Sequence, residues 1–267
     1  MDVVCAGLPP DGARIHADVS VRAGGSAVNA AFSAAEAGAT ATVIGRVGSD
    51  PSGNFVVATL EERGIEAQLA RDPDHTTGAA VAFGSSVVAH RGANAHLSSA
   101  DIPELLVADA LLVSGFALFQ GGSTQAARAA LERLDGRWAA VDLATPKLAR
   151  AAKLDEVATI ANVILATAEE AHAATGAADE EEAARILAAR FAVACVKLGE
   201  QGAIAVQADN LERAKATPVA RSSPFGAGDA FAGALLVALS RGEPLSRALE
   251  LGCEAGARSA AAQVLGR

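Results

Sequence analysis

Short β-branched runs alternate with longer stretches rich in alanine and leucine along most of this chain. Alternation of this kind is typical of βαβ units, in which helices cover both faces of a parallel sheet. It predicts buried parallel strands at residues 3–5, 41–44, 110–113, 138–142, 163–165 and 193–197. It predicts helices at residues 26–38, 51–63, 124–134, 179–190 and 229–241, with Asp50 as the N-cap of the second.

Two segments do not follow this alternation. Residues 13–21 carry apolar and polar side chains by turns, which favours a half-exposed strand. Residues 78–89 hold two β-rich pieces broken at Gly84-Ser85-Ser86, which predicts a hairpin. Because no repeat, low-complexity tail or linker interrupts the chain, we expect residues 1–267 to form one domain.

Charge and hydropathy exclude several classes of protein. Asp and Glu outnumber Lys and Arg by 31 to 22 with no basic run, so we expect no nucleic acid partner. The longest stretch without a charged residue, 110–127, contains three glycines and several polar residues, so we expect no membrane span. Cys5, Cys195 and Cys253 lie in apolar surroundings without metal-like spacing, and the chain starts like a strand, which together predict a cytoplasmic protein with reduced thiols.

The segment Gly226-Ala227-Gly228-Asp229 is followed at once by a long apolar helical pattern. The two glycines allow a tight turn and close approach of a ligand to the backbone. The free N–H groups and the dipole of a helix start favour negative charge, so the segment predicts an anion site. Asp229 would repel that anion, and a proton-abstracting base is one reason for a carboxylate there. The alternative is that Asp229 only caps or precharges the first helical turn.

A second motif lies near the N-terminus, where Gly24-Gly25 opens an alanine-rich helix and Asn29 follows one turn later. The two motifs, in this order and at this separation, resemble the signatures of the ribokinase-like carbohydrate kinases, also called the PfkB family. Further matches lie between them, at Arg91-Gly92-Ala93-Asn94, Leu112-Val113-Ser114-Gly115 and Leu198-Gly199-Glu200-Gln201-Gly202.

The resemblance implies a three-layer α/β/α sandwich with a mostly parallel central sheet and a small, shortened β lid at about residues 13–22 and 77–95. It implies ATP-dependent phosphorylation of a hydroxyl or hydroxymethyl group on a small sugar or related compound, with Mg²⁺ as cofactor. Asp229 would be the general base, and the backbone of Gly226, Ala227 and Gly228 would stabilise the transferred phosphoryl group.

The resemblance also implies binding residues. Gly24, Gly25, Asn29 and Asn94 would contact the substrate, although Asn94 could instead stabilise a turn. The nucleotide would contact Lys197, Gly199, Gly202 and Cys253; alternatively the glycines close a β-hairpin and Lys197 is a strand-end charge. Glu170 would contact Mg²⁺ through water, and the alternative is a surface acid in the first turn of a helix.

Three departures from the family pattern bear on function. No residue clearly replaces the family's early sugar-binding Asp, for which Asp11 and Asp18 are weak candidates. The family's N-x-x-E motif becomes Thr167-Ala168-Glu169-Glu170, without its Asn. Ser223-Pro224-Phe225 precedes the second motif where relatives have an Asp and a Thr, so monovalent-cation activation is doubtful.

These departures keep a second function open, namely a family member that binds or regulates with little kinase activity. A dinucleotide-dependent oxidoreductase is not favoured, because no G-x-G-x-x-G turn follows the first strand. Relatives often dimerise through the lid, but the shortened lid exposes fewer strand edges, so a homodimer and a monomer are both compatible with the sequence. Ribose, fructose, a 2-keto-3-deoxy sugar acid and a nucleoside are all compatible substrates. A sugar acid would require an arginine in the pocket, with Arg14, Arg22 and Arg91 as candidates.

Overall fold

The computed structural model describes residues 1–5, 12, 14, 16, 18–83, 86–219 and 225–264. Its central sheet has the strand order β14-β13-β12-β11-β10-β8. The strands are β8 (Ala110–Ser114), β10 (Trp138–Asp142), β11 (Val163–Thr167), β12 (Val193–Lys197), β13 (Ala203–Gln207) and β14 (Asn210–Ala214). The first four are parallel, whereas β13 and β14 continue the sheet as antiparallel strands. The mostly parallel central sheet is therefore confirmed.

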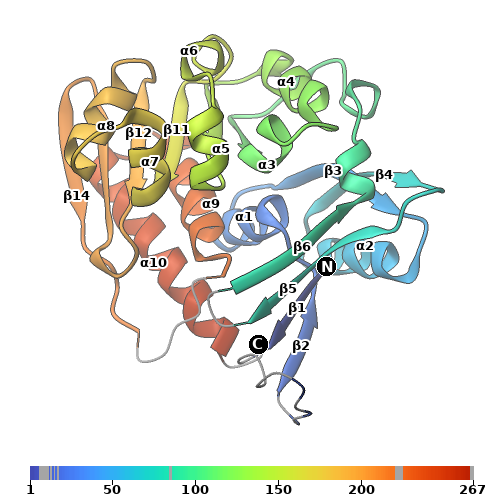
Figure 1. The fold of residues 1–267 in the computed structure, drawn as a ribbon. Coiled ribbons are helices and arrows are strands. Elements are labelled where there is room, and N and C mark those ends of the chain that lie inside the picture. Colours follow the sequence, from blue (N-terminus) through green and yellow to red (C-terminus); the bar gives the residue numbers. More distant parts are fainter. Residues whose placement is uncertain are drawn as a thin grey trace.

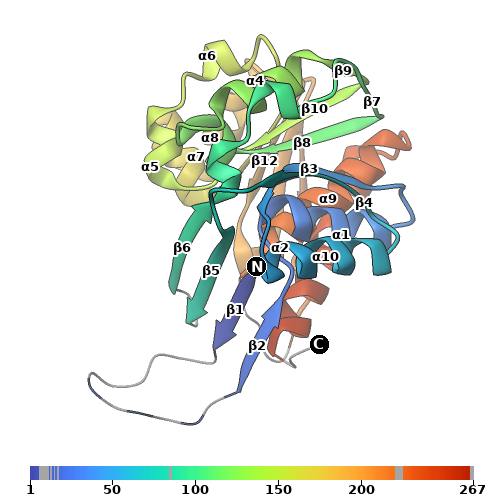
Figure 2. The same cartoon turned by 90° about the vertical axis from the view of Figure 1, so that its right-hand side faces the viewer.

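Helices cover both faces of this sheet, so the three-layer architecture is confirmed as well (Figure 2). One face carries α3 (Gly115–Phe119), α4 (Thr124–Glu132), α5 (Pro146–Ala151), α6 (Leu154–Val157), α7 (Ala168–Thr175) and α8 (Glu180–Ala188). The other face carries α9 (Ala227–Ser240) and α10 (Leu245–Val264), and α1 (Ser26–Glu36) packs against α9. Strand residues such as Val141 and Leu165 are fully buried between the two layers, as expected for parallel strands covered on both sides.

A smaller unit lies beside the central sheet. Strands β3 (Thr42–Gly48) and β4 (Glu66–Asp72) form a parallel pair that packs with α1 and α2 (Pro51–Glu62) around a separate apolar cluster. Asp50 caps α2 as predicted, because its Oδ1 accepts a hydrogen bond from the Gly53 N–H at 2.7 Å. The remaining short elements are β7 (Leu106–Val107), β9 (Leu134–Asp135) and the 3₁₀ turns η1 (Ala93–His96), η2 (Ser99–Asp101) and η3 (Gly199–Gln201).

A four-stranded sheet, which we call the lid, lies outside the three layers (Figure 1). Its order is β2-β1-β5-β6, formed by β1 (Asp2–Cys5), β2 (Val19–Arg22), β5 (Thr77–Phe83) and β6 (Ser86–Gly92). The predicted hairpin is present as the antiparallel β5–β6 pair, although residues 84 and 85 lie outside the described part of the chain. Of the predicted strand at residues 13–21, only the end is described, as β2.

Two of the strands predicted for the central sheet belong to other sheets. β1 lies in the lid, parallel to β5 and antiparallel to β2, and β3 pairs only with β4. A short apolar run predicts a strand but carries no information about which sheet the strand joins. The prediction was therefore right about the strands and wrong about their place.

Candidate active site

The two sequence motifs meet at the start of α9. Asn29 Nδ2 donates a hydrogen bond to Asp229 Oδ2 at 2.9 Å. Burial raises the pKa of Asp229 to about 6, although hydrogen bonds from Asn29 and Ser26 and the charge of Lys197 act in the opposite direction. The donor belongs to α1, so the carboxylate of Asp229 is held by a side chain from outside its own helix, α9. A carboxylate with this pKa can accept a proton near neutral pH.

Close packing between α1 and α9 fixes this pair of side chains. A Cβ atom on Gly233 would lie 2.2 Å from the carbonyl oxygen of Ala30, so only glycine allows the two helices to approach this closely. One turn away, the buried Ser33 hydroxyl donates to the carbonyl oxygen of Ala230 at 2.7 Å. The backbone N–H groups of the first turn of α9, which begins at Ala227 after the left-handed Gly226, have no partners within the helix.

Asp2, on β1, is a buried acid that lies against Gly24 of the Gly-Gly turn and was not predicted as a site residue from the sequence. Its side chain is 2% exposed, and a Cβ on Gly24 would lie 1.8 Å from its Oδ2 atom. Burial raises the pKa of Asp2, while the N-terminal amine, Arg22 and a hydrogen bond from the Gly25 backbone lower it. Among the described residues, Oδ2 has no hydrogen-bond partner. Asp18 is exposed and Asp11 lies outside the described residues, so Asp2 is the best candidate for the early sugar-binding Asp.

An ion pair lies next to the anion site, at the carboxyl ends of two central strands. Lys197 Nζ donates to Asp142 Oδ2 at 2.5 Å, and both side chains are largely buried. Burial lowers the pKa of Lys197, but the charge and hydrogen bond of Asp142 outweigh it and keep the pKa above its ordinary value. A Cβ on Gly228 would lie 3.4 Å from Lys197 Nζ. The ammonium group is therefore close to the turn predicted to bind phosphate, and Asp142 is a second residue that the sequence analysis missed.

Glu170 is the N3 residue of a capping box at the start of α7. It accepts from the Thr167 N–H at 2.8 Å, and its own N–H donates to Thr167 Oγ1 at 3.3 Å. The side chain is buried, so the alternative was wrong about a surface position but right about the first turn of a helix. Burial raises the pKa of Glu170, Asp142 adds to this, and Lys197 opposes it. Its contact with Mg²⁺ stays a prediction.

Besides Lys197 on β12, the predicted nucleotide residues lie at the η3 turn and on α10. Gly199 begins the η3 turn that joins β12 to the antiparallel β13, and Gly202 is its C-cap, so the two glycines do close a β-hairpin. A Cβ on Gly202 would lie 2.0 Å from the Ala214 carbonyl oxygen, whereas one on Gly199 would meet nothing within 4 Å. Cys253 is buried in α10 with the apolar cluster around α9, and burial raises the pKa of its thiol to about 11. Nucleotide contact at these positions stays a prediction.

Asn94 lies on η1, where its Oδ1 accepts a hydrogen bond from the Arg46 N–H at 3.1 Å. This contact links η1 to β3, which agrees with the turn-stabilising alternative, and the exposed side chain leaves substrate contact as a prediction. Asp50 has a second partner besides its cap, because its Oδ2 accepts from the Thr77 N–H at 2.7 Å. The cap of α2 is thereby joined to lid strand β5.

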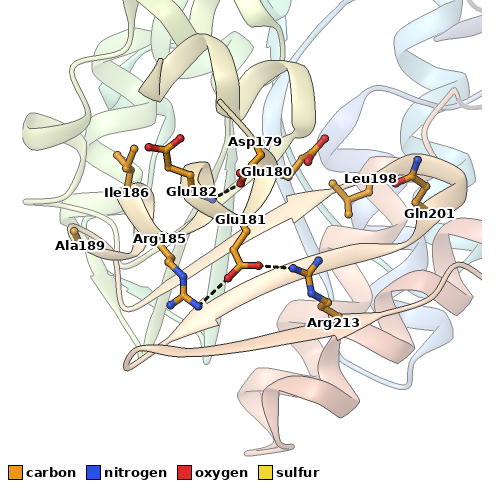
Figure 3. Close-up of a pocket in the computed structure, with 10 residues that line it drawn as sticks. All are labelled: Asp179, Glu180, Glu181, Glu182, Arg185, Ile186, Ala189, Leu198, Gln201 and Arg213. Atoms are coloured by element: carbon orange, nitrogen blue, oxygen red, sulfur yellow. Dashed lines mark hydrogen bonds and ion pairs between the residues drawn. The ribbon is translucent and has the colours of Figure 1, made fainter. Parts of the chain in front are cut away.

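A separate hollow of about 740 Å³ is lined by α8, by the η3 turn with Leu198 before it, and by Arg213 of β14 (Figure 3). Figure 3 shows Glu181 between Arg185 and Arg213, with which it forms ion pairs at 3.0 Å and 2.5 Å. The wall also carries the acids Asp179, Glu180 and Glu182. Because carboxylates outnumber the arginines and these are paired, the hollow does not suit a phosphate group.

Two further features limit the site. Within the described residues, no group of three or more His, Cys, Asp or Glu side chains is placed to hold a metal ion directly. No described helix has the length and apolarity needed to span a membrane.

A family model for the pfkB family of carbohydrate kinases matches residues 3–263 of this sequence. The chain belongs to the PfkB family. It is therefore an enzyme of the carbohydrate kinase class, and the recognition made from the two motifs is confirmed.

Individual PfkB relatives act on different kinds of substrate. The chain is 27% identical to a 5-dehydro-2-deoxygluconokinase of Bacillus subtilis, over 86% of this chain and 78% of the relative. It is 30% identical to a cytidine kinase of Thermococcus kodakarensis, over 92% of this chain and 88% of the relative. A fructokinase of Vibrio cholerae, solved with fructose, ADP and calcium bound, has a TM-score of 0.79 at 26% identity, covering 96% of this chain and 88% of the fructokinase. The PfkB fold is thus shared with sugar, sugar-acid and nucleoside kinases.

Proposed function

We propose that this PfkB kinase transfers the γ-phosphoryl group of ATP to a hydroxyl or hydroxymethyl group of a small sugar-like substrate. The observation that carries the proposal is the Asn29–Asp229 hydrogen bond at the start of α9. It holds a carboxylate whose pKa is about 6 beside free backbone N–H groups. A base and an anion site side by side are what phosphoryl transfer to a hydroxyl requires.

In the proposed step, Asp229 accepts the proton of the substrate hydroxyl. The hydroxyl oxygen forms a bond to the γ-phosphorus while the bond to the bridging oxygen breaks, and ADP leaves. Backbone N–H groups of Gly226, Ala227 and Gly228 stabilise the charge of the transferred group. The Lys197 ammonium group close to Gly228 adds a positive charge on the same side.

The substrate lies on the Gly-Gly turn in this proposal. Asp2 accepts hydrogen bonds from substrate hydroxyls, and Asn29 orients both Asp229 and the substrate. The unpartnered Oδ2 atom of Asp2 supports this role, because a buried acceptor without a partner is costly until a ligand supplies a donor. Gly24, Gly25 and Asn94 complete the proposed substrate contacts.

The nucleotide lies along η3 and α10 in this proposal, with Lys197, Gly199, Gly202 and Cys253 beside it. Open space at Gly199 supports close approach of a ligand to that turn. Mg²⁺, when bound, neutralises charge on the nucleotide phosphates. Glu170 and Asp142 would hold it through water, which fits the absence of a direct chelating cluster among the described residues. Residues 223 and 224 lie outside the described residues, so the doubt about a monovalent cation stays a prediction from sequence.

The alternative function, a binder with little kinase activity, loses part of its support. It rested in part on the lack of an early acid, and Asp2 is a buried acid beside Gly24; the other departures from the family pattern still stand. A cytoplasmic location stays a proposal, and of the two oligomeric states left open by the sequence we propose the homodimer. The lid carries four exposed valines that a second copy would cover, at positions Val19, Val21, Val87 and Val88. Sedimentation of the protein as a monomer at micromolar concentration would reject the dimer.

The experiment that tests the proposed function measures ADP release from magnesium-ATP across a panel of sugars, sugar acids and nucleosides. Phosphorus NMR of each active mixture then identifies the new phosphate ester. Asp229→Asn is compared with Asp155→Asn, the same change at an exposed acid far from the site. Turnover of one substrate that disappears only in Asp229→Asn supports the proposal. Binding of ATP without turnover of any substrate supports the alternative.

A further inference from the structure

The guanidinium group of Arg22 lies near the candidate active site but has no role in the proposed mechanism. Strands β1 and β2 lie side by side in the lid (Figure 1), and Asp2 and Arg22 are directly paired in their antiparallel register. Directly paired residues project from the same face of a sheet. Arg22 Nη2 is buried without a hydrogen-bond partner among the described residues, as is Asp2 Oδ2. The two unpartnered atoms are therefore on one face of the lid but not bonded to each other.

The guanidinium group of Arg22 also reaches the second motif. It lies over the ring of Phe225, with 5.8 Å between the Cζ atom and the ring centroid. Phe225 directly precedes Gly226, the N-cap of α9. Arg22 thus lies between the Gly-Gly turn, where Asp2 rests, and the turn that we assign to phosphate.

Because Arg22 Nη2 and Asp2 Oδ2 are buried without a partner among the described residues, a ligand that bonds to them would be favourable. Desolvation lowers the pKa of Arg22 and raises that of Asp2, and the opposite charge of the other group offsets each shift only in part. A buried charged donor without a partner is unfavourable, and an oxyanion is its natural complement. Of the other two arginines considered for the pocket, Arg14 is exposed and Arg91 donates to Gly121 O and Ser123 Oγ.

We propose that Arg22 binds an oxyanion of the acceptor substrate, and that the kinase therefore selects a sugar acid over a neutral sugar or nucleoside. A hydroxyl group of such a substrate donates to Asp2 while its carboxylate accepts from Arg22. The same guanidinium could also bind the transferred phosphoryl group, which is chemically an oxyanion too. This inference rests on the proposed function for the place of the substrate, but its first test does not require turnover.

The test measures binding by calorimetry with three matched pairs: D-gluconate and D-glucitol, D-galactonate and galactitol, D-ribonate and ribitol. Each pair differs only in a carboxylate against a hydroxymethyl group, and cytidine serves as a neutral nucleoside. The variants are Arg22→Gln and Arg22→Lys. The first removes the positive charge, and the second keeps the charge but loses the planar guanidinium that can donate two parallel hydrogen bonds to a carboxylate. The control is Arg63→Gln, since Arg63 also lies over a phenylalanine ring, Phe32, but away from the site.

We expect at least one acid to bind about tenfold or more tightly than its alcohol, and Arg22→Gln to abolish this difference. Arg22→Lys should keep part of it, and Arg63→Gln all of it. Equal binding of acids and alcohols, or a preference for acids that survives in Arg22→Gln, overturns the proposal. So does a protein that binds only cytidine or the alcohols.

Kinetics on the accepted substrate separates the two sources of oxyanion. If the carboxylate is bound, Arg22→Gln raises KM for the acid and leaves KM for ATP unchanged. If instead kcat falls equally for acids and neutral substrates, the oxyanion is the transferred phosphoryl group and the selection of acids is rejected. Binding of acids through Arg22 in a protein without turnover would support this inference while the proposed kinase function fails.

Discussion

Asn29 donates a hydrogen bond to Asp229 at 2.9 Å, although the two residues are 200 positions apart in the sequence. The bond joins the helix that follows the Gly-Gly turn to the helix that follows the anion site. It also favours the charged form of a carboxylate whose burial favours the neutral form. Asn29 therefore tunes the proposed base as well as positioning it.

Replacing Asn29 with alanine should raise the pKa of Asp229, because the hydrogen bond that stabilises its charged form is lost. In the wild type, activity should fall as the pH drops through about 6. In Asn29→Ala, this acid limb should move to higher pH, so the loss of kcat/KM is largest near neutral pH and smaller at about pH 9. The measurement is a pH profile of kcat/KM for both proteins. Asn54→Ala, the same change at an exposed position on α2, is the control, and an acid limb at the same pH in Asn29→Ala would contradict the account.

Asp229→Asn should stabilise the folded protein at neutral pH. The pKa of Asp229 is raised from 3.8 to about 6, so above pH 6 the folded state holds a carboxylate that is more stable in the unfolded chain. The variant avoids this penalty, which is about 1–3 kcal/mol after allowance for the partial exposure of the side chain. As the pH falls from 6 towards 3.8, the wild type takes up the proton and the difference disappears. Thermal unfolding across this range checks the prediction, and a constant difference in Tm would contradict it.

Gly233→Ala should disturb stability and catalysis together. The new methyl group would lie 2.2 Å from the Ala30 carbonyl oxygen and force α1 away from α9. We expect a loss of about 1–3 kcal/mol in the free energy of unfolding, together with a lower kcat because Asn29 moves from Asp229. Chemical denaturation and steady-state kinetics measure the two effects. Ser240→Ala, at the far end of α9, should leave kcat unchanged; full activity of Gly233→Ala would mean that this helix contact does not position the base.

Lys197→Met should be strongly destabilising, by about 3–5 kcal/mol, since it leaves the largely buried Asp142 carboxylate without its partner. The double variant Asp142→Leu/Lys197→Met should regain most of this stability. Its affinity for magnesium-ATP should still be lower, because the positive charge near Gly228 and the proposed Mg²⁺-holding carboxylate of Asp142 are both gone. Denaturation of the single and double variants forms a double-mutant cycle. Additive losses would show that the ion pair contributes nothing to the fold.

The two motifs could be predicted from sequence because each is local. Gly226 to Asp229 and Gly24 to Asn29 combine a turn, a helix start and a polar side chain within a few residues. Their meeting in space followed from the resemblance to a known family. The four parallel strands of the central sheet, β8, β10, β11 and β12, were also predictable, since β-branched runs separated by helical patterns leave few alternatives. The antiparallel strands β13 and β14 were not among the predicted strands.

Asp2 and Asp142 were missed because their importance depends on distant partners. Asp2 is buried by the cross-strand pairing of β1 with β2 and by Gly24, and no local pattern contains these contacts. Asp142 pairs with Lys197, which is 55 positions later in the sequence. Its one local signal was an acid at the carboxyl end of a predicted parallel strand, the edge where ligands bind in α/β sheets. Distant partners also decide which sheet β1 and β3 join, because the residue pattern of a strand does not predict its neighbours.

The turnover of Asp229→Asn, measured beside its affinity for ATP, tests the central claim most directly. On the accepted substrate, kcat should fall by about 10²–10⁴-fold while calorimetry gives an ATP affinity close to that of the wild type. That result would establish Asp229 as the base of a kinase whose nucleotide site is intact. Turnover close to that of the wild type would contradict the account, because the carboxylate at the start of α9 would then have no part in the transfer.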